Sequence, residues 1–382
     1  MQEDLLRKLI EWRHHLHANP ELSEKESETA RFICGRLTEF GIPFSAGVGG
    51  NGIVATLKRG SSNRSIGLRA DMDALPIAEE SALPYRSKVP GVMHACGHDG
   101  HTVALLGAAA TLAQDENWSG TANFIFQPAE ELYTGAKAMI ADDLHQRFPM
   151  ERIFAFHNWP GLKAGTVAVH NGPVMAAGGR WEMTLRGLAG HAAKPHTTRD
   201  PIAAAGHLIV ALQSIVARTV DPADIVVLSI GAIHGGSVAT QIPDSVTLVG
   251  TLRTYKPEVR TAVIASMERI GQGVASTFGM EIEIKILSTG RATVNTAEEA
   301  ALAADAASDA GLVVRRDLSP SGTGDDFSLL LGDRRGAYVW IGNGEGSELH
   351  NASYDFNDAI LPAAIGWMMH LTRLALPQTD PI

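Results

Sequence analysis

Residues 101–126 read HTVALLGAAATLAQDENWSGTANFIF, and this stretch indicates the fold class. Its first half, His101–Ala113, has the length and apolar spacing of a helix, and its end, Ala122–Phe126, is a short apolar run typical of a buried strand. Further runs of this kind occur at residues 53–57, 66–68 and 153–156, and further helical spacing occurs at residues 5–16 and 29–40. Strands that alternate with helices predict an α/β domain, which we expect to hold a mixed sheet covered by helices on both faces.

The pattern changes at about residue 179, where a second unit is predicted to begin. A strand at 180–186 precedes a helix that Asp200 caps and Pro201 opens. The elements that follow are strands at 224–233 and 245–254, a helix at 257–279 and a strand at 281–287. The order βαββαβ is that of a ferredoxin-like unit. We therefore expect a discontinuous first domain, residues 1–178 and 291–382, with a ferredoxin-like domain inserted at residues 179–290.

Length and composition exclude several classes of protein. The 382 residues suffice for about two domains, and a hydrophobic content of 45% excludes a disordered chain. Acidic residues outnumber basic ones 42 to 32, and with a net charge of −10 we expect no nucleic-acid partner. The two cysteines, Cys34 and Cys96, exclude a disulfide scaffold.

The start of the chain, MQEDLLRKLIEWR, is acidic and amphipathic, which is unlike a signal peptide. The longest weakly polar stretches, residues 103–113 and 361–369, fall short of the roughly 18–20 residues that a membrane span needs. We therefore expect a cytoplasmic protein without a membrane partner.

The segment MHACGHDGH, residues 93–101, concentrates the side chains that bind metals. Cys96 and His98 lie two residues apart, so in extended backbone their side chains project to the same side. Thiolate, imidazole and carboxylate are the ligands that zinc and similar divalent ions prefer. A structural zinc site usually needs four ligands with paired cysteines, which this chain lacks. The segment therefore favours a catalytic metal over a structural zinc knuckle or a chance cluster.

Two adjacent carboxylates, Glu130 and Glu131, follow the strand predicted at 122–126. Because neighbouring residues at the end of a strand point in different directions, one can hold a metal while the other reaches a water. His157 likewise follows the predicted strand at 153–156, and His350 comes a few residues after a strand predicted at 338–341. Open α/β sheets bind ligands beyond the carboxyl ends of their strands, so this convergence is stronger evidence than any one segment.

Six further polar residues each have two interpretations. Four aspartates either orient a histidine ligand or serve in turns and caps: Asp71, Asp73, Asp325 and Asp326. In the inserted unit, His191 lies in a turn after the first strand and is either a polar loop residue or a functional one. Arg253 is either a solvated strand residue or a site for a carboxylate.

These segments resemble the amidohydrolase branch of the dinuclear metallo-aminoacylase and carboxypeptidase family, which includes hippurate hydrolases, N-acyl-amino-acid amidohydrolases and auxin-conjugate hydrolases. The resemblance runs in order through residues 17–358 and so covers nearly the whole chain. Its most specific motifs are MHACGHDGH and QPAEE, and the others are HANPELSEKESETA, LRADMDALPI, FHNWP, GHAAKPH, GGSVATQIPDSVTLVGTLRT and LHNASYDFND.

The resemblance implies metal-dependent hydrolysis of the amide bond of N-acyl amino acids, by a water that bridges two metal ions and with Glu130 as the general base. It implies two divalent ions per subunit, with zinc or manganese favoured over cobalt or nickel, and five ligands: Cys96, His98, Glu131, His157 and His350. The first domain is then catalytic, and the inserted domain is a lid through which a homodimer or a higher oligomer forms. In that dimer, His191 reaches the active site of a partner subunit.

Two positions depart from the pattern of the family. Thr240 stands where relatives usually carry an asparagine that contacts substrate, and Gly179 stands where an aspartate commonly precedes the first strand of the lid. Thr240 and Arg253 are the candidate substrate contacts, and the preferred acyl group and amino acid stay open. The alternatives are a metallo-carboxypeptidase or dipeptidase that acts on short peptides, and a metal-binding protein without activity.

Overall fold

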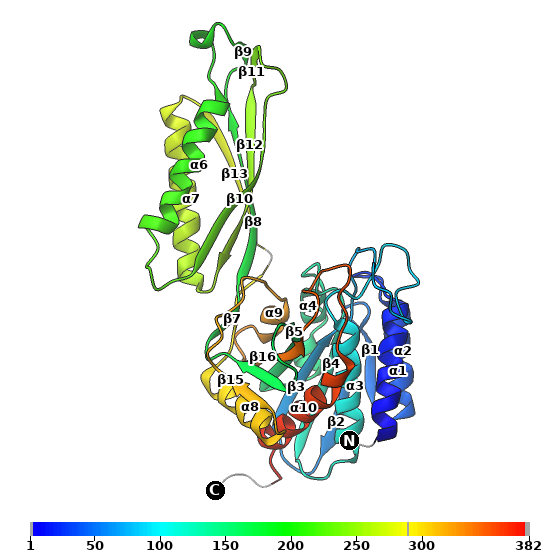
Figure 1. Cartoon of the computed structure of the whole chain (residues 1–382). Helices are drawn as coiled ribbons and strands as arrows, with labels where there is room; N and C mark the ends of the chain where they lie inside the picture. The colour runs from blue at the N-terminus through cyan, green and yellow to red at the C-terminus, as the bar shows by residue number, and fades with distance from the viewer. Residues whose placement is uncertain (1–2, 289, 379–382) are drawn as a thin grey trace. The chain divides into compact units, whose positions relative to one another are not determined.

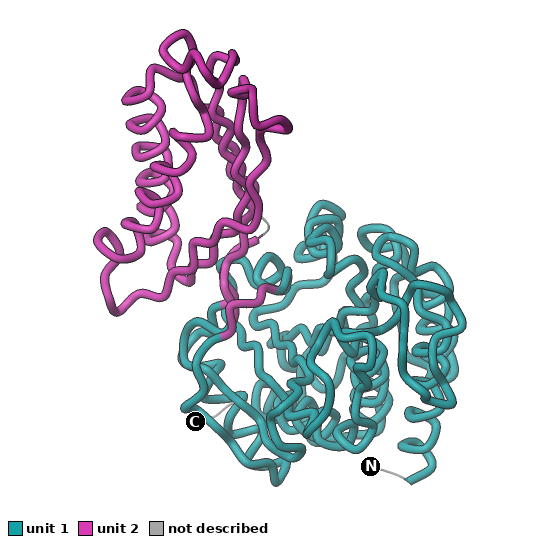
Figure 2. Tube along the Cα trace, turned by 45° about the horizontal axis from the view of Figure 1, so that its top comes forward, with its two compact units in different colours: residues 1–174, 294–320, 325–382 teal, residues 175–293, 321–324 magenta. Residues whose placement is uncertain are grey.

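The computed structural model describes residues 3–288 and 290–378 of the chain. They divide into two compact units (Figure 2): unit 1 comprises residues 1–174, 294–320 and 325–382, and unit 2 comprises residues 175–293 and 321–324. Residues 321–324 were predicted to belong to the first domain and not to the inserted domain. They join unit 2 because the N–H of Ala176 donates to the carbonyl oxygens of Ser321 and Thr323, at 3.1 and 2.9 Å.

Unit 1 is built on an eight-stranded sheet with the order β1-β2-β4-β3-β5-β16-β6-β15 (Figure 1). Its strands are β1 (Phe44–Val48), β2 (Gly52–Arg59), β3 (Ser65–Asp71), β4 (Gly120–Gln127), β5 (Arg152–Pro160), β6 (Thr166–Val169), β15 (Val313–Arg315) and β16 (Arg335–Gly344). The central strands β4, β3, β5 and β16 run parallel, whereas β2 and β6 are antiparallel to their neighbours β4 and β16. The prediction of a mixed sheet is therefore confirmed, although the short strands β1, β6 and β15 were not predicted.

Helices cover both faces of this sheet. One face buries a large apolar core under five helices: α1 (Glu3–Ala18), α2 (Ser27–Glu39), α3 (His98–Gln114), α8 (Ala297–Asp309) and α10 (Leu361–Ala375). Leu68 belongs to this core, and the next residue of the strand, Arg69, points to the opposite face, where its guanidinium lies over the ring of Phe327. That opposite face carries the short helices α4 (Gly135–Ala141), α5 (Leu144–Arg147) and α9 (Phe327–Leu331).

The parallel strands bring their carboxyl ends to one edge of the sheet. The ends are Asp71 of β3, Gln127 of β4, Pro160 of β5 and Gly344 of β16. Helix α3 also begins near this edge, because Thr102 in its first turn donates to the carbonyl oxygen of Asp71 at 3.1 Å. In an open α/β sheet this edge is where ligands bind.

Unit 2 holds a four-stranded antiparallel sheet with the order β10-β12-β8-β13. Its strands are β8 (Ala177–Arg186), β10 (Val226–His234), β12 (Ser245–Thr254) and β13 (Glu281–Ser288), and its helices are α6 (Pro201–Arg218) and α7 (Pro257–Thr277). Both helices pack on the sheet over a separate apolar core that includes Trp181, Leu208 and Met267. The short elements are η1 (Pro195–Thr197) in unit 2, η2 (Asp358–Ile360) in unit 1, and two strand pairs, β9 (Gly190–His191) with β11 (Gln241–Ile242) and β7 (Pro173–Met175) with β14 (Thr293–Val294).

Helix α6 corrects one expectation from the sequence. It is long and apolar enough, by length and composition, to cross a membrane, whereas the sequence analysis found no such stretch. Its 18 residues are 33% buried, and Leu208 and Leu212 on the buried side belong to the core of unit 2. The polar residues His207, Gln213 and Ser214 interrupt its apolar runs, so the segment does not stand out in the sequence as one continuous apolar stretch. The cytoplasmic location stays a prediction.

Candidate active site

A tight turn positions the first two candidate ligands, Cys96 and His98. Between them, Gly97 has a φ of 87°, and a Cβ at this position would lie 2.5 Å from Oδ1 of Asn158. Only glycine fits such a position, because it combines a left-handed backbone with close approach to a neighbour. His98 is the first residue of α3, and both flanking side chains are buried. The glycine therefore sets two ligand side chains against the end of β5.

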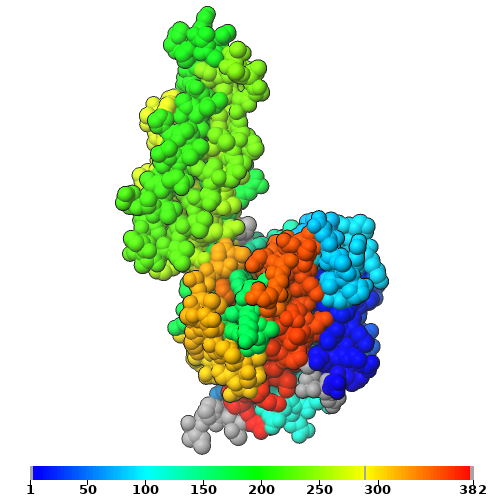
Figure 3. Space-filling view, in the orientation of Figure 1, coloured from blue at the N-terminus to red at the C-terminus, as the bar shows by residue number. Residues whose placement is uncertain are grey.

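The other candidate ligands come from three further segments. Glu131 lies in the loop after β4, and His157 is a buried residue of β5. His350 follows β16 in a loop that lies beside the segment after β3, as Figure 3 shows in orange and light blue. A hydrogen bond of 2.8 Å from the N–H of Glu80 to the carbonyl oxygen of Ala352 holds these two segments together.

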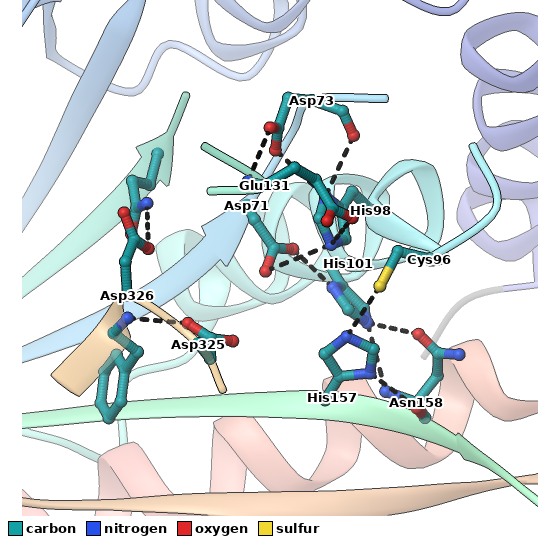
Figure 4. A network of polar contacts seen from close by, with 12 residues as sticks. Asp71, Asp73, Cys96, His98, His101, Glu131, His157, Asn158, Asp325 and Asp326 are labelled. Carbon is teal, nitrogen blue, oxygen red and sulfur yellow. Dashed lines mark hydrogen bonds and ion pairs between the residues drawn. The ribbon is translucent and has the colours of Figure 1, made fainter. Parts of the chain in front are cut away.

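The structure brings all five predicted ligands together (Figure 4 labels four of them). Sγ of Cys96 lies 3.4 Å from Nε2 of His157. Oε1 of Glu131 lies 3.5 Å from Nε2 of His350 and 3.9 Å from Nε2 of His98. These side chains form two groups, Cys96 with His98 and His157, and Cys96 with Glu131 and His350, in each of which the ligand atoms lie within 4.8 Å of one another.

The donor set fits divalent metal ions. Among the described residues, Nε2 of His98 and Oε1 of Glu131 are buried and have no hydrogen-bond partner. Burial, together with the nearby Asp73 carboxylate, raises the pKa of Glu131 to about 7. Burial and the Glu131 carboxylate raise the pKa of the Cys96 thiol well above its usual value. A bound cation would satisfy the unpartnered atoms and stabilise the carboxylate and the thiolate.

Asp73 and Asp71 hold the ligands in place. Nδ1 of His98 lies 3.2 Å from Oδ1 of Asp73, and the N–H of Glu131 donates to Oδ2 of Asp73 at 3.1 Å. Asp71 contacts Nδ1 of His101 at 2.6 Å. Although burial lowers the pKa of His98, the Asp71 carboxylate outweighs it and raises that pKa. Of the two interpretations of these aspartates, the geometry favours the orientation of histidine.

Glu130 lies beside the ligands without facing solvent. Its carboxylate is within 4.8 Å of His98 and Glu131 in one group, and of Asp325 and Asp326 in another. Only 6% of the residue is exposed, so this pair of glutamates is not an ordinary solvated pair. Burial, and then the carboxylate of Asp325, raise the pKa of Glu130 well above its usual value.

Sequence reasoning missed Arg69, a fully buried residue that ties the site together. Its guanidinium donates to Oδ2 of Asp71 at 2.7 Å, to Oε1 of Gln127 at 2.8 Å and to Oδ1 of Asp326 at 3.1 Å. It thereby links the ends of β3 and β4 to the loop before α9. One signal could have found it, namely an arginine among the otherwise apolar residues 66–70, because buried arginines are rare unless paired.

His191, predicted as a catalytic residue, and Thr240, a candidate substrate contact, both lie in unit 2. His191 is an exposed residue of β9 and is paired with Gln241 of β11. The carbonyl oxygen of Thr240 accepts the N–H of Ala192 at 3.0 Å. His191 therefore lies on this small strand pair and Thr240 directly before it, and the roles of both residues stay predictions.

Arg253 of β12 has a neighbour that the sequence did not reveal. Burial, and then the charge of Arg253, lower the pKa of Arg260 on α7. Both terminal nitrogens of Arg260 are buried, and they have no hydrogen-bond partner within the described part of the chain. A Cβ at Gly179 would lie 2.7 Å from Nη2 of Arg260, so the glycine leaves room beside this guanidinium. Two neighbouring guanidinium groups form a candidate anion site in unit 2.

Fold and site together define a class, namely an α/β protein with a cluster of metal ligands, three of which are buried, and a neighbouring buried carboxylate at the carboxyl edge of its sheet. The sequence matches peptidase family M20/M25/M40 over residues 67–373. The chain therefore belongs to this family, which confirms the resemblance seen in the sequence.

Known relatives match nearly the full length of the chain. Hippurate hydrolase of Campylobacter jejuni is 40% identical over 361 residues, or 94% of each chain. N-acetyl-L-cysteine deacetylase of Bacillus subtilis is 40% identical over 362 residues, or 94% of this chain and 86% of its own length. A crystal structure of a Bacillus subtilis protein described as a dinuclear metal-binding peptidase of the M20 family has 34% identity and a TM-score of 0.88, and the match covers 98% of this chain and 99% of that one.

Proposed function

We propose that this chain hydrolyses the amide bond of N-acyl amino acids in a metal-dependent reaction that releases a carboxylic acid and a free amino acid. The observation that carries the proposal is the convergence of five metal-ligand side chains with Glu130 at the carboxyl edge of the sheet. The names of the two relatives at 40% identity, a hippurate hydrolase and an N-acetyl-L-cysteine deacetylase, support this class of substrate.

Two divalent ions are the proposed cofactors. Cys96 belongs to two ligand groups, one with His98 and His157 and one with Glu131 and His350, which suits a pair of ions. Bound ions would polarise the amide carbonyl and lower the pKa of a water. Because mixed thiolate, imidazole and carboxylate ligation suits several metals, we propose zinc or manganese first and cobalt or nickel next.

Glu130 is the proposed general base. Its carboxylate takes a proton from the attacking water and then delivers it to the nitrogen of the leaving amine. Burial beside other carboxylates raises the pKa of Glu130, which makes its carboxylate a stronger base than that of an exposed glutamate. Arg69, Asp71 and Asp326 keep the surrounding loops in register while this proton moves.

Unit 2 is proposed to act as a ferredoxin-like lid and to form a homodimer. The strand order β10-β12-β8-β13 with two helices supports the ferredoxin-like assignment. The edge strand β10 exposes Val227 and Ile233, and α6 exposes Val210 at 73%. Unpaired apolar edges favour pairing with a second copy. In that dimer, His191 of one subunit donates a hydrogen bond to the oxyanion that forms in the site of the other.

Arg253 is proposed to bind the carboxylate of the amino acid, with Thr240 beside the acyl amide. The unpartnered guanidinium of Arg260 next to Arg253 supports a carboxylate site, because a planar guanidinium matches a carboxylate in geometry and charge. A carboxypeptidase or dipeptidase activity on short peptides is the alternative, and it is favoured by the peptidase description of the family.

A substrate panel separates these activities. Amino-acid release is measured from N-acetyl, N-benzoyl and indoleacetyl amino acids and from dipeptides, before chelation, after chelation, and after each divalent metal is added back. Release from the acyl compounds that chelation abolishes and one metal restores is the expected result. Release from dipeptides alone would replace the proposal with the peptidase activity, and release that survives complete chelation would contradict both.

A further inference from the structure

Glu26 occupies a helix-capping position without capping the helix. It is the residue before α2, where a carboxylate usually accepts hydrogen bonds from the first free amides of the helix, but its side chain makes no such bond. Glu21 takes over this task, because its two carboxylate oxygens accept the N–H groups of Glu28 at 3.2 Å and Thr29 at 2.8 Å. The carboxylate of Glu26 is therefore available for another role.

That carboxylate reaches a distant part of the chain. Its Oε1 accepts the N–H of Ala129, 103 residues away, at 2.8 Å, and the N–H of Glu24 at 3.0 Å. Its Oε2 accepts a hydrogen bond from Nδ2 of Asn51 at 2.9 Å. Glu26 is fully buried, and burial raises the pKa of its carboxyl group. Burial of a carboxylate costs free energy, and the hydrogen bonds that it accepts offset this cost.

The two amides bound by Oε1 share an unusual backbone conformation. Ala129 has a φ of 48° and Glu24 has a φ of 68°, and both are non-glycine residues in the left-handed region. This conformation is unfavourable for residues with a Cβ, and it persists only where the surroundings enforce it. Ala129 immediately precedes Glu130 and Glu131, so its backbone conformation sets the direction in which both carboxylates leave the loop.

We propose that Glu26 is a positioning residue that holds the amide of Ala129 and thereby aims Glu130 at the reacting water. The proposal rests on the proposed role of Glu130 as the general base. Within the described part of the chain, the hydrogen bonds of its carboxylate come from Glu24, Asn51 and Ala129 and from none of the five candidate ligands. Its contribution is the hydrogen bond that fixes one strained residue next to the base.

The size of the expected effect follows from the geometry of proton transfer. A displacement of about 1 Å at a reacting group can cost on the order of 100-fold in rate. Loss of the Ala129 anchor should therefore lower kcat by about 10- to 100-fold. KM and metal content should stay close to the wild-type values, because no substrate contact or ligand is removed.

Two conservative variants distinguish the length of the Glu26 side chain from its charge. Glu26→Asp keeps the charge but shortens the side chain by one methylene, so it no longer reaches Ala129. Glu26→Gln loses the charge but keeps an oxygen at the position of Oε1, and the side-chain amide of Asn51 can turn to accept from the new NH₂ group. We expect the fall in kcat in Glu26→Asp and near wild-type kcat in Glu26→Gln. The opposite order, or equal losses in both, would overturn the proposal.

Two further variants distinguish positioning from general loss of structure. Glu21→Gln weakens the cap of α2 but does not touch Ala129, so it should leave kcat unchanged; an equal fall in kcat there would contradict the proposal. Ala129→Gly removes the steric penalty of the left-handed backbone. In the double variant with Glu26→Asp, kcat should be at least threefold higher than in Glu26→Asp alone. An unchanged kcat in the double variant would contradict the role of Ala129.

Hydrogen exchange tests the anchor independently of activity. The amides of residues 127–133 should exchange at least tenfold faster in Glu26→Asp than in the wild type and in Glu26→Gln, measured by mass spectrometry on the metal-loaded protein. Unchanged exchange would refute the anchor even if kcat fell. A wild type that cleaves no amide would instead refute the proposed function, while the exchange experiment would still decide whether Glu26 holds this loop.

Discussion

The two units present their candidate functional residues in opposite ways. In unit 1, Cys96 and His98 are buried, and the ligands are fixed by neighbours such as Asp73. In unit 2, His191 is exposed on a two-residue strand, and Arg260 has buried nitrogens without a partner among the described residues. The candidate site of unit 1 is held by neighbouring side chains, whereas these residues of unit 2 are exposed or, within the described part of the chain, have no hydrogen-bond partner.

Under the proposed function, this difference separates the residues of unit 1, which carry out the reaction, from the residues of unit 2, which bind the substrate. Groups that move protons or hold metals gain from rigid placement, because reorganisation during the reaction then costs little. Groups that contact a substrate can stay exposed until it binds. Variants in unit 1 should therefore change kcat or metal affinity, and variants in unit 2 should act through substrate binding or through the dimer.

The largest effect is expected at the proposed base. Glu130→Gln keeps the shape of the side chain but cannot accept the proton of the water, so kcat should fall by about 10³- to 10⁴-fold. Metal content, measured by elemental analysis, should stay at the wild-type level because none of the five ligands is changed. A wild-type kcat in Glu130→Gln would show that Glu130 is not the general base.

The next largest effect tests whether unit 2 acts on a partner subunit. His191→Ala removes one donor to the oxyanion, and kcat should fall by about 10²- to 10³-fold. Mixing this variant with Glu130→Gln should restore part of the activity, since a heterodimer then contains one intact combined site. Verified heterodimers without any recovery would show that His191 does not act across the dimer.

A smaller effect is expected where a carboxylate only orients ligands. Asp73→Ala removes the contacts to His98 and Glu131, and metal affinity should weaken by about 10- to 100-fold in competition with a chelator. Ser23→Ala is the matched control, because Ser23 donates to the same carboxylate at 2.7 Å without touching a ligand. Unchanged metal affinity in Asp73→Ala would show that the contacts of Asp73 to His98 and Glu131 do not contribute to metal binding.

The smallest effect on activity, with a clear effect on stability, is expected at His17. Burial lowers its pKa, but the Asp99 carboxylate 2.8 Å away outweighs burial and raises the pKa to about 9. A raised pKa stabilises the fold fully below the unfolded value of about 6.5, and this stabilisation is lost as the pH rises through about 9. The free energy of unfolding should therefore fall by up to about 3 kcal/mol across this range, as measured by urea unfolding.

Two variants check this assignment. In His17→Gln the fall in the free energy of unfolding between pH 6.5 and 9 should be smaller than in the wild type, because the contribution of His17 is lost while His98, whose pKa is also raised, still titrates. In His94→Gln it should persist, because burial lowers the pKa of His94 to about 4, so that residue does not titrate in this window. A wild-type stability that stays level from pH 6.5 to 9 would refute the His17–Asp99 interaction as a source of stability.

The sequence alone determined the features that depend on short-range pattern. Apolar spacing predicted the longer helices and most strands, but not the short helices α4, α5 and α9, and the strand at 245–254 has the predicted bounds. The motif MHACGHDGH and the pair Glu130–Glu131 indicated metal chemistry because few other residue types bind divalent ions. The short strands β1, β6 and β15 escaped prediction because three to five residues, partly exposed at β1 and β15, carry too little periodic signal.

The tertiary structure decided what no local pattern contains. Arg69 and Asp71 of β3 form one network with Gln127 and Asp326, because three separate segments meet at the carboxyl edge of the sheet. Glu26 precedes the helix α2, and only the fold shows that its carboxylate accepts a hydrogen bond from Ala129, 103 residues away. Spacing along the chain can specify which side chains share a strand or a helix face, but contacts between distant segments depend on how the whole chain packs.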